Sequence, residues 1–142
     1  MVDVHDKKTR SFNMSRIRGC NTRPETYVRS ELHRRGFRFR INVKELPGKP
    51  DLLFPKYRKA VFVHGCFWHQ HFNCQKSHMP KSNLIFWKSK LKKNVLRDRR
   101  NEKHLREKGW EPLIIWECEL RKGDDAIQKL AEKIITCPED NC

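Results

Sequence analysis

Residues 51–64, DLLFPKYRKAVFVH, contain two apolar runs separated by a short polar stretch. The runs at 51–54 and 60–63 have the length of β-strands, and Pro55 and Arg58 bound a stretch with the composition of a turn. A connection this short joins strands that pair antiparallel. The stretch therefore predicts a β-hairpin whose second strand is apolar throughout.

A third strand is expected just before this hairpin. Residues 37–41, FRFRI, alternate strictly between apolar and basic side chains. This alternation predicts a half-exposed strand with Phe37, Phe39 and Ile41 buried and the two arginines pointing outward. Because short turns join all three strands, we expect them to form an antiparallel meander.

A helix is expected before the meander. Thr22-Arg-Pro-Glu25 has the pattern of a capping box, with threonine as the cap and the glutamate able to reach back to it. Val28 and Leu32 are four residues apart, as on a buried helix face, and Gly36 is suited to end the helix.

Three further elements are expected after the meander. Residues 83–108 have the periodicity of a long helix, and Gly109 ends it. Residues 113–116 predict a strand buried on both faces, and residues 124–135 predict an amphipathic helix. The apolar stripe of the long helix includes Leu84, Trp87, Leu91, Val95 and Leu105. The order α-β-β-β-α-β-α predicts an α/β domain over residues 1–142, with a mixed central sheet flanked by helices.

The charge is strongly positive and unevenly distributed. The 142 residues carry 32 Lys+Arg and 17 Asp+Glu, a formal net charge of +15. Up to Trp110 there are 28 basic and 9 acidic residues, whereas from Glu111 onward there are 4 basic and 8 acidic. A small domain needs only about 2–8 net charges for solubility, so this excess favours a nucleic acid as the partner. The sequence has no apolar run of membrane-spanning length and no hydrophobic signal core at its start, so we expect a cytoplasmic protein without a membrane partner.

Three of the six cysteines are arranged with a histidine in a pattern typical of structural zinc. Cys66, His71 and Cys74 have the spacing C-x4-H-x2-C, and Cys118 follows the fourth predicted strand. Three thiolates and one imidazole make a closed tetrahedral zinc site. His69 or His64 could replace His71 as the fourth ligand, since spacing alone does not decide among them.

A second group of residues has the chemistry of phosphodiester hydrolysis. Asp51 opens one predicted strand and His64 ends the next, so the two can approach each other across the hairpin. A divalent metal such as magnesium needs a carboxylate and other oxygen ligands, and a carbonyl near Val63 can add one. His64 or His69 can accept a proton from water. Glu25 is either a capping residue or a supporting carboxylate, depending on where its helix packs.

The chain resembles the very short patch repair endonucleases. The resemblance is carried by DVHDKKTRSFNMSRIR at 3–18, PGKPD at 47–51, VHGCFWH at 63–69, Phe86-Trp87, Asn94-Val-x-Arg-Asp98 and Trp116-Glu-Cys118. The match extends from Val2 to about Leu120, and HGCFWH is its most specific motif.

This resemblance implies a restriction-endonuclease-like core in which His64 replaces the usual lysine. It implies that Asp51 and the main-chain carbonyl of Val63 bind Mg²⁺, and that His69 is the general base, assisted by His64 and Glu25. The implied zinc ligands are Cys66, His71, Cys74 and Cys118.

The resemblance also implies the substrate. This is double-stranded DNA with a T:G mismatch left by deamination of 5-methylcytosine, which is nicked on the 5′ side of the mispaired thymine. The implied DNA contacts are Phe67, Trp68 and Trp87 as wedges, Lys90 and Asn94 on the long helix, and Met14 on an N-terminal arm spanning residues 1–21. Residues 136–142 are expected to be a flexible tail.

We further expect a monomer, because one chain with one catalytic centre cuts one strand. The family implies a bacterial, nucleoid-associated protein that meets mismatch-repair proteins. Two other functions fit part of the sequence. The first is a non-catalytic zinc module that binds distorted duplex, and the second is a restriction-type enzyme that cuts both strands.

Overall fold

The structure is a computed structural model that describes residues 22–136. The predicted N-terminal arm with Met14 lies outside the described residues, and so does the predicted tail at residues 136–142 apart from Thr136. No helix within 22–136 is both long enough and apolar enough to cross a membrane.

The described elements follow the predicted order, with two short additions. The helices are α2 (Arg23–Arg34), α3 (Leu84–Glu107), α4 (Glu117–Leu120) and α5 (Asp125–Ile135), and a single 3-10 turn, η1, covers Gln75–Ser77. The strands are β1 (Arg40–Ile41), β2 (Leu52–Phe54), β3 (Lys59–His64) and β4 (Glu111–Trp116). The sheet order is β1-β2-β3-β4. The first three strands form the predicted antiparallel meander, and β4 pairs parallel with β3.

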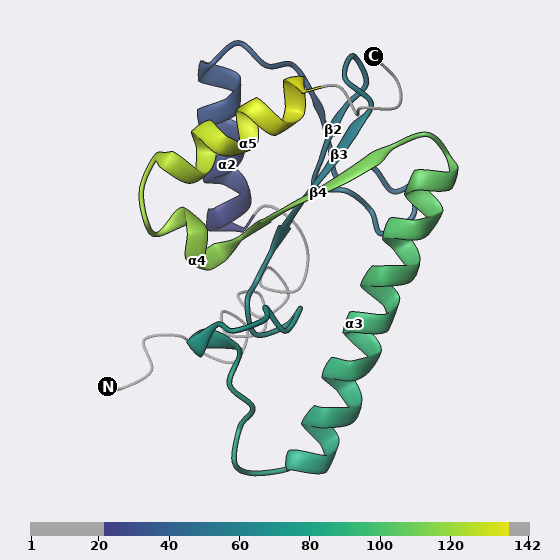
Figure 1. Cartoon of the computed structure of the whole chain (residues 1–142), viewed down its shortest axis with the longest axis vertical. Coiled ribbons are helices and arrows are strands. Elements are labelled where there is room, and N and C mark those ends of the chain that lie inside the picture. The colour runs from purple at the N-terminus through teal and green to yellow at the C-terminus, as the bar shows by residue number, and fades with distance from the viewer. Residues whose placement is uncertain (1–21, 137–142) are drawn as a thin grey trace, which may run out of the picture.

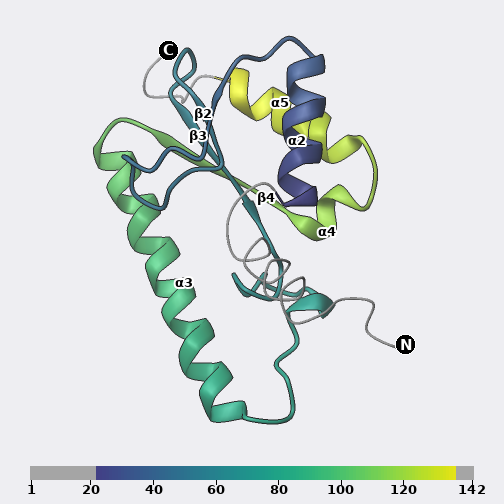
Figure 2. The ribbon, with the colours of Figure 1, turned by 180° about the vertical axis from the view of Figure 1, so that it is seen from behind.

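Alternating side chains of the central strands divide the core into two parts. On one face, Leu52, Phe54 and Val61 pack with apolar residues of α2 and α5. On the other face, Leu53, Ala60 and Phe62 pack with Leu105 of α3. Figures 1 and 2 show this arrangement, with α2 and α5 together on one side of the strands and α3 on the other. The mixed α/β architecture is therefore confirmed.

The start of α2 departs from the predicted capping box. The Glu25 backbone N–H donates to the Thr22 hydroxyl at 3.3 Å, which is the expected first half of the motif. The Glu25 carboxylate instead accepts a hydrogen bond from Arg29 at 3.2 Å and is buried. The glutamate is thus directed into the interior and away from the helix cap.

Three burial predictions are wrong at the edges of the fold. Ile41 is 46% exposed, because β1 is a two-residue edge strand with a neighbour on one side only. β4 is the opposite edge strand, and Leu113, Ile114 and Trp116 are only half-buried. Leu84 is exposed because the N-terminal part of α3 extends past the sheet, as Figure 1 shows.

Candidate active site and metal cluster

A cavity of about 530 Å³ lies where α2, β3 and α3 come together with the loop at residues 42–50. The sequence-predicted residues in its lining are Glu25, Asp51, Val63, His64 and His69. Residues 97, 98, 101 and 102 of α3 complete the lining together with residues of the loop. The structure therefore brings the predicted catalytic residues into one cavity.

Asp51 is fixed between the ends of two strands. Its backbone N–H donates to the Val61 carbonyl at 3.0 Å, and its Oδ2 accepts a hydrogen bond from the Val63 N–H at 2.7 Å. Burial raises the pKa of Asp51 to about 7, and the neighbouring Glu25 carboxylate acts in the same direction. A cation at this position would favour the ionised carboxylate, because it offsets both effects.

His64 and His69 lie one on the other at the side of this cavity. Their ring centroids are 3.7 Å apart and the planes differ by 3°. Burial lowers the pKa of His64 to about 3, so this imidazole is neutral at physiological pH. Because the lone pairs of an imidazole lie in the ring plane, two stacked rings are poorly oriented to ligate one ion, although His64, His69 and Asp98 lie close enough together to suggest it. The arrangement suits proton transfer better.

Asp98 belongs to a motif that carries the family resemblance, but the sequence reasoning gave it no role in the site. Its Oδ2 lies 2.6 Å from Nδ1 of His69. A carboxylate in this position holds the proton on Nδ1 and leaves Nε2 able to accept one, which is the tautomer that a general base needs. One signal was available, since Asp98 follows Asn94 by four residues and therefore lies on the same face of α3. Asn94 Nδ2 donates to the Trp68 carbonyl at 3.1 Å, so adjacent loop residues are held by one helix face.

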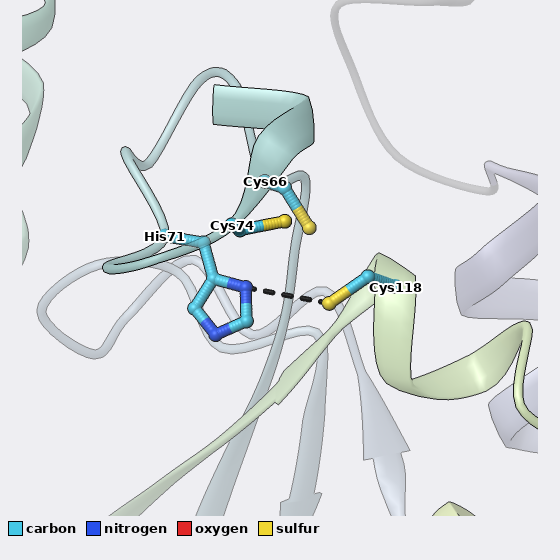
Figure 3. A group of neighbouring side chains, drawn as sticks. All are labelled: Cys66, His71, Cys74 and Cys118. Carbon is cyan, nitrogen blue, oxygen red and sulfur yellow. Dashed lines mark hydrogen bonds between the residues drawn. The ribbon is translucent and has the colours of Figure 1, made fainter. Parts of the chain in front are cut away.

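The four predicted zinc ligands converge on one point. Their ligand atoms all lie within 4.8 Å of one another, and the His71 ring nitrogen Nδ1 is 3.3 Å from Cys118 Sγ. In Figure 3, Cys66, His71 and Cys74 extend from the loop after β3 toward Cys118 at the start of α4. Of the histidines left open by spacing, it is His71 that lies with the cysteines, whereas His64 and His69 lie in the cavity.

The chemistry of this cluster fits a thiophilic cation. Burial raises the pKa of the Cys66 thiol to about 12, and the nearby Cys118 and Cys74 side chains add to this effect. Three sulfurs this close become thiolates together only when a cation compensates their charge. His71 also stacks on Trp116 of β4, with ring centroids 4.1 Å apart, which attaches the loop to the sheet.

The predicted aromatic wedges form one cluster between the loop and α3. Phe67 lies 5.1 Å from Trp68 and 5.4 Å from Trp87 between ring centroids. Trp68 is 46% exposed. Trp87 therefore packs on the loop aromatics, although sequence periodicity also placed it on the core-facing stripe of its helix. Lys90 is exposed on α3.

Comparisons with known proteins identify the family of this chain. Residues 2–76 match the family model described as DNA mismatch endonuclease Vsr. Type II nicking enzyme V.XorIIP of Xanthomonas oryzae pv. oryzae is 47% identical over 120 residues, which are 84% of this chain and 88% of that protein. DNA mismatch endonuclease Vsr of Escherichia coli is 44% identical over 136 residues, covering 96% of this chain and 84% of that protein. Type II nicking enzyme V.NmeAIP of Neisseria meningitidis is 46% identical over 121 residues, covering 85% and 86% respectively.

These matches first define the class, because every relative named above is an enzyme that cuts DNA. The protein is an endonuclease. More specifically, the chain belongs to the Vsr family of DNA mismatch endonucleases, which confirms the resemblance found in its motifs.

Replacing Asp98 with asparagine should remove the carboxylate that holds the proton on Nδ1 of His69, without altering the fold. We expect Asp98→Asn to lower the single-turnover nicking rate by about 100-fold or more, the usual contribution of a general base. Affinity for DNA, measured by fluorescence anisotropy, should stay close to that of the wild type. Glu107→Gln is the matched control, because Glu107 is exposed near the end of the same helix. If the two variants nick at the same rate, Asp98 has no role in positioning the base.

Proposed function

We propose that this protein nicks double-stranded DNA on the 5′ side of the mispaired thymine of a T:G mismatch, in a reaction that depends on Mg²⁺. The observation that carries the proposal is the meeting of Asp51, His64 and His69 in one cavity beside an aromatic cluster. Membership of the Vsr family supports the substrate. The four-stranded mixed sheet is consistent with a restriction-endonuclease-like core in which His64 replaces the usual lysine.

Asp51 and the main-chain carbonyl of Val63 would hold the magnesium ion. Asp51 fits this role because it is a largely buried carboxylate next to a second one, Glu25, and both line the cavity. Oxygen ligands of this kind are those that Mg²⁺ prefers. When bound, the ion would supply the positive charge that polarises the phosphoryl group.

His69 acts as the general base in this proposal. A water oxygen forms a bond to phosphorus while the bond from phosphorus to the leaving sugar oxygen breaks. Nε2 of His69 takes one proton from the water, and the leaving oxygen receives a proton from solvent. Asp98 stabilises the resulting imidazolium through the 2.6 Å contact at Nδ1. His64 is neutral and stacks on His69, so it assists by fixing the position of the base. Glu25 lies next to Asp51 and assists by fixing the position of that carboxylate.

The aromatic cluster is proposed to detect the mismatch. Inserting Phe67, Trp68 and Trp87 between base pairs costs a few kcal/mol of unstacking per step, and a mispaired step costs less than a matched one. Selectivity follows from this difference. Lys90 and Asn94 on α3, and Met14 outside the described residues, are proposed as further DNA contacts.

The cysteine cluster is proposed to bind a structural Zn²⁺ through Cys66, His71, Cys74 and Cys118. This ion would fix the loop that carries both the aromatic wedges and His69. We propose that the protein works as a monomer made of one domain, in the bacterial cytoplasm at the nucleoid, where it meets mismatch-repair proteins.

A strand-resolved digestion tests the proposed activity. A duplex with one T:G pair, labelled on each strand separately, should be nicked only on the thymine strand, 5′ to the thymine, and only when Mg²⁺ is present. Asp51→Asn should bind this duplex but nick it about 1000-fold more slowly, because the metal contributes several kcal/mol to the transition state. Asp125→Asn, an exposed position on α5, is the control. Breaks in both strands would instead favour a restriction-type enzyme, and binding without any nicking would favour a non-catalytic module.

Removing one indole tests the mismatch sensor. Trp68→Ala should reduce the ratio of nicking rates on T:G and T:A duplexes by roughly tenfold, since one base stacked on an aromatic ring is worth about 1–3 kcal/mol. Phe72→Ala is a matched control, because Phe72 lies on the same loop and is 84% exposed. An unaltered ratio in Trp68→Ala would mean that discrimination arises elsewhere.

Replacing one cysteine tests the zinc cluster. Purified wild-type protein should contain zinc in equal amount to the chain by elemental analysis, and Cys118→Ser should lose most of it. We expect its Tm to fall by about 5–10 °C, which for a chain of this length corresponds to about 2–3 kcal/mol. Cys142→Ser, whose cysteine is outside the described residues, should keep its zinc. Full zinc content in Cys118→Ser would remove Cys118 from the ligand set.

A further inference from the structure

The cavity has more negative than positive groups at the place where a phosphate must enter. Four carboxylates line it, from Glu25, Asp51, Asp98 and Glu102. A phosphodiester carries a negative charge of its own, and its transition state concentrates this charge on the non-bridging oxygens. The two histidines are already engaged, because His69 contacts Asp98 and His64 is buried beneath its ring. Beside the proposed Mg²⁺, a cationic side chain would offset the remaining repulsion between these carboxylates and the phosphate.

Arg97 is placed to meet this need. It lines the cavity from α3, directly before Asp98. Its Nη2 lies 4.0 Å from Oδ1 of Asp98, whereas Oδ2 of the same carboxylate contacts His69.

The guanidinium remains available for a ligand. The Arg97 side chain is 55% exposed, and within residues 22–136 its recorded polar contact is the loose 4.0 Å ion pair with Asp98. A pair at this distance and exposure contributes little to stability. An arginine beside a cavity lined by four carboxylates, without a close partner among the described residues, is therefore poorly explained by a structural role.

The other cations of the cavity are less suitable. Lys44 and Lys49 are exposed on the loop at residues 42–50. A lysine ammonium is a single, strongly hydrated point charge, whereas a guanidinium offers two parallel N–H donors that match two phosphate oxygens. The Arg97 guanidinium lies 4.0 Å from the carboxylate that contacts His69, so a phosphate bound to it would lie close to the base.

We propose that Arg97 is a phosphate-binding residue of the nicking reaction, which holds the non-bridging oxygens of the phosphate that is cut. This inference rests on the proposed function, because it assigns one more group to the same cavity. Arg97 thus keeps the reacting phosphate within reach of His69 and compensates the charge that develops on its oxygens.

Nicking assays give the first test. Arg97→Ala should lower the single-turnover rate on the T:G duplex by about 100-fold, the usual effect of removing one donor to a developing oxyanion. Arg97→Lys keeps the charge without the paired donors, so its nicking rate should lie between those of Arg97→Ala and the wild type. Arg99→Ala loses the same charge from an exposed position of α3 outside the cavity and should nick nearly as fast as wild type. Equal rates in Arg97→Ala and Arg99→Ala would overturn the proposal.

A neutral phosphate gives the second test, which a structural role would not affect. The probe is a T:G duplex with a methylphosphonate at the position to be cut, and its binding is compared with that of the unmodified duplex in the absence of metal. Relative to the unmodified duplex, the methylphosphonate should cost the wild type about tenfold more affinity than it costs Arg97→Ala, as expected when a charge-assisted hydrogen bond is lost. Arg99→Ala should behave as the wild type does.

The same measurements separate this proposal from the proposed function. If wild type nicks the T:G duplex and the methylphosphonate acts equally on wild type and Arg97→Ala, only the role of Arg97 is wrong. If wild type does not nick the duplex at all, the proposed function is wrong and this inference fails with it.

Discussion

The 2.6 Å contact between Nδ1 of His69 and the Asp98 carboxylate joins two parts of the chain that are 29 residues apart in sequence. His69 belongs to the loop after β3, and Asp98 belongs to the exposed middle of α3. One turn earlier on the helix, Asn94 holds the carbonyl of Trp68. The loop is thus attached to one face of the helix through two neighbouring residues, one with an aromatic side chain and one with an imidazole. In our account, recognition and hydrolysis both depend on this attachment, because any displacement of the loop moves the mismatch-sensing Trp68 together with the base His69.

The rest of the fold serves to keep the loop and the helix in place. The alternating side chains of β2 and β3 fill two cores, and the second core fixes α3 through the fully buried Leu105. The first core fixes α2, whose buried Glu25 turns toward Asp51. The four-residue cysteine and histidine cluster attaches the other side of the loop to the end of β4. The cavity is therefore enclosed by elements that are distant in sequence and individually well anchored.

Sequence periodicity predicted the strands and helices well because they obey local rules. It was wrong at Ile41 and Leu84, whose exposure depends on where the sheet and the helix end relative to each other. Spacing predicted Cys66, Cys74 and Cys118 as a set but left the histidine open. In the structure the positive φ of 50° at Gln70 turns the chain between His69 and His71, and His71 lies with the cysteines while His69 lines the cavity. The role of Asp98 was not predicted, although its motif was noted, since its contact with His69 spans 29 residues and depends on how α3 docks.

The most direct test of this account is the protonation of the two ring nitrogens of His69. Long-range ¹H–¹⁵N correlation spectra of the zinc-loaded protein at mildly alkaline pH report each nitrogen separately. The account predicts that Nδ1, facing Asp98, carries the proton and that Nε2 is unprotonated and available as a base. A His69 ring with its proton on Nε2 would contradict it.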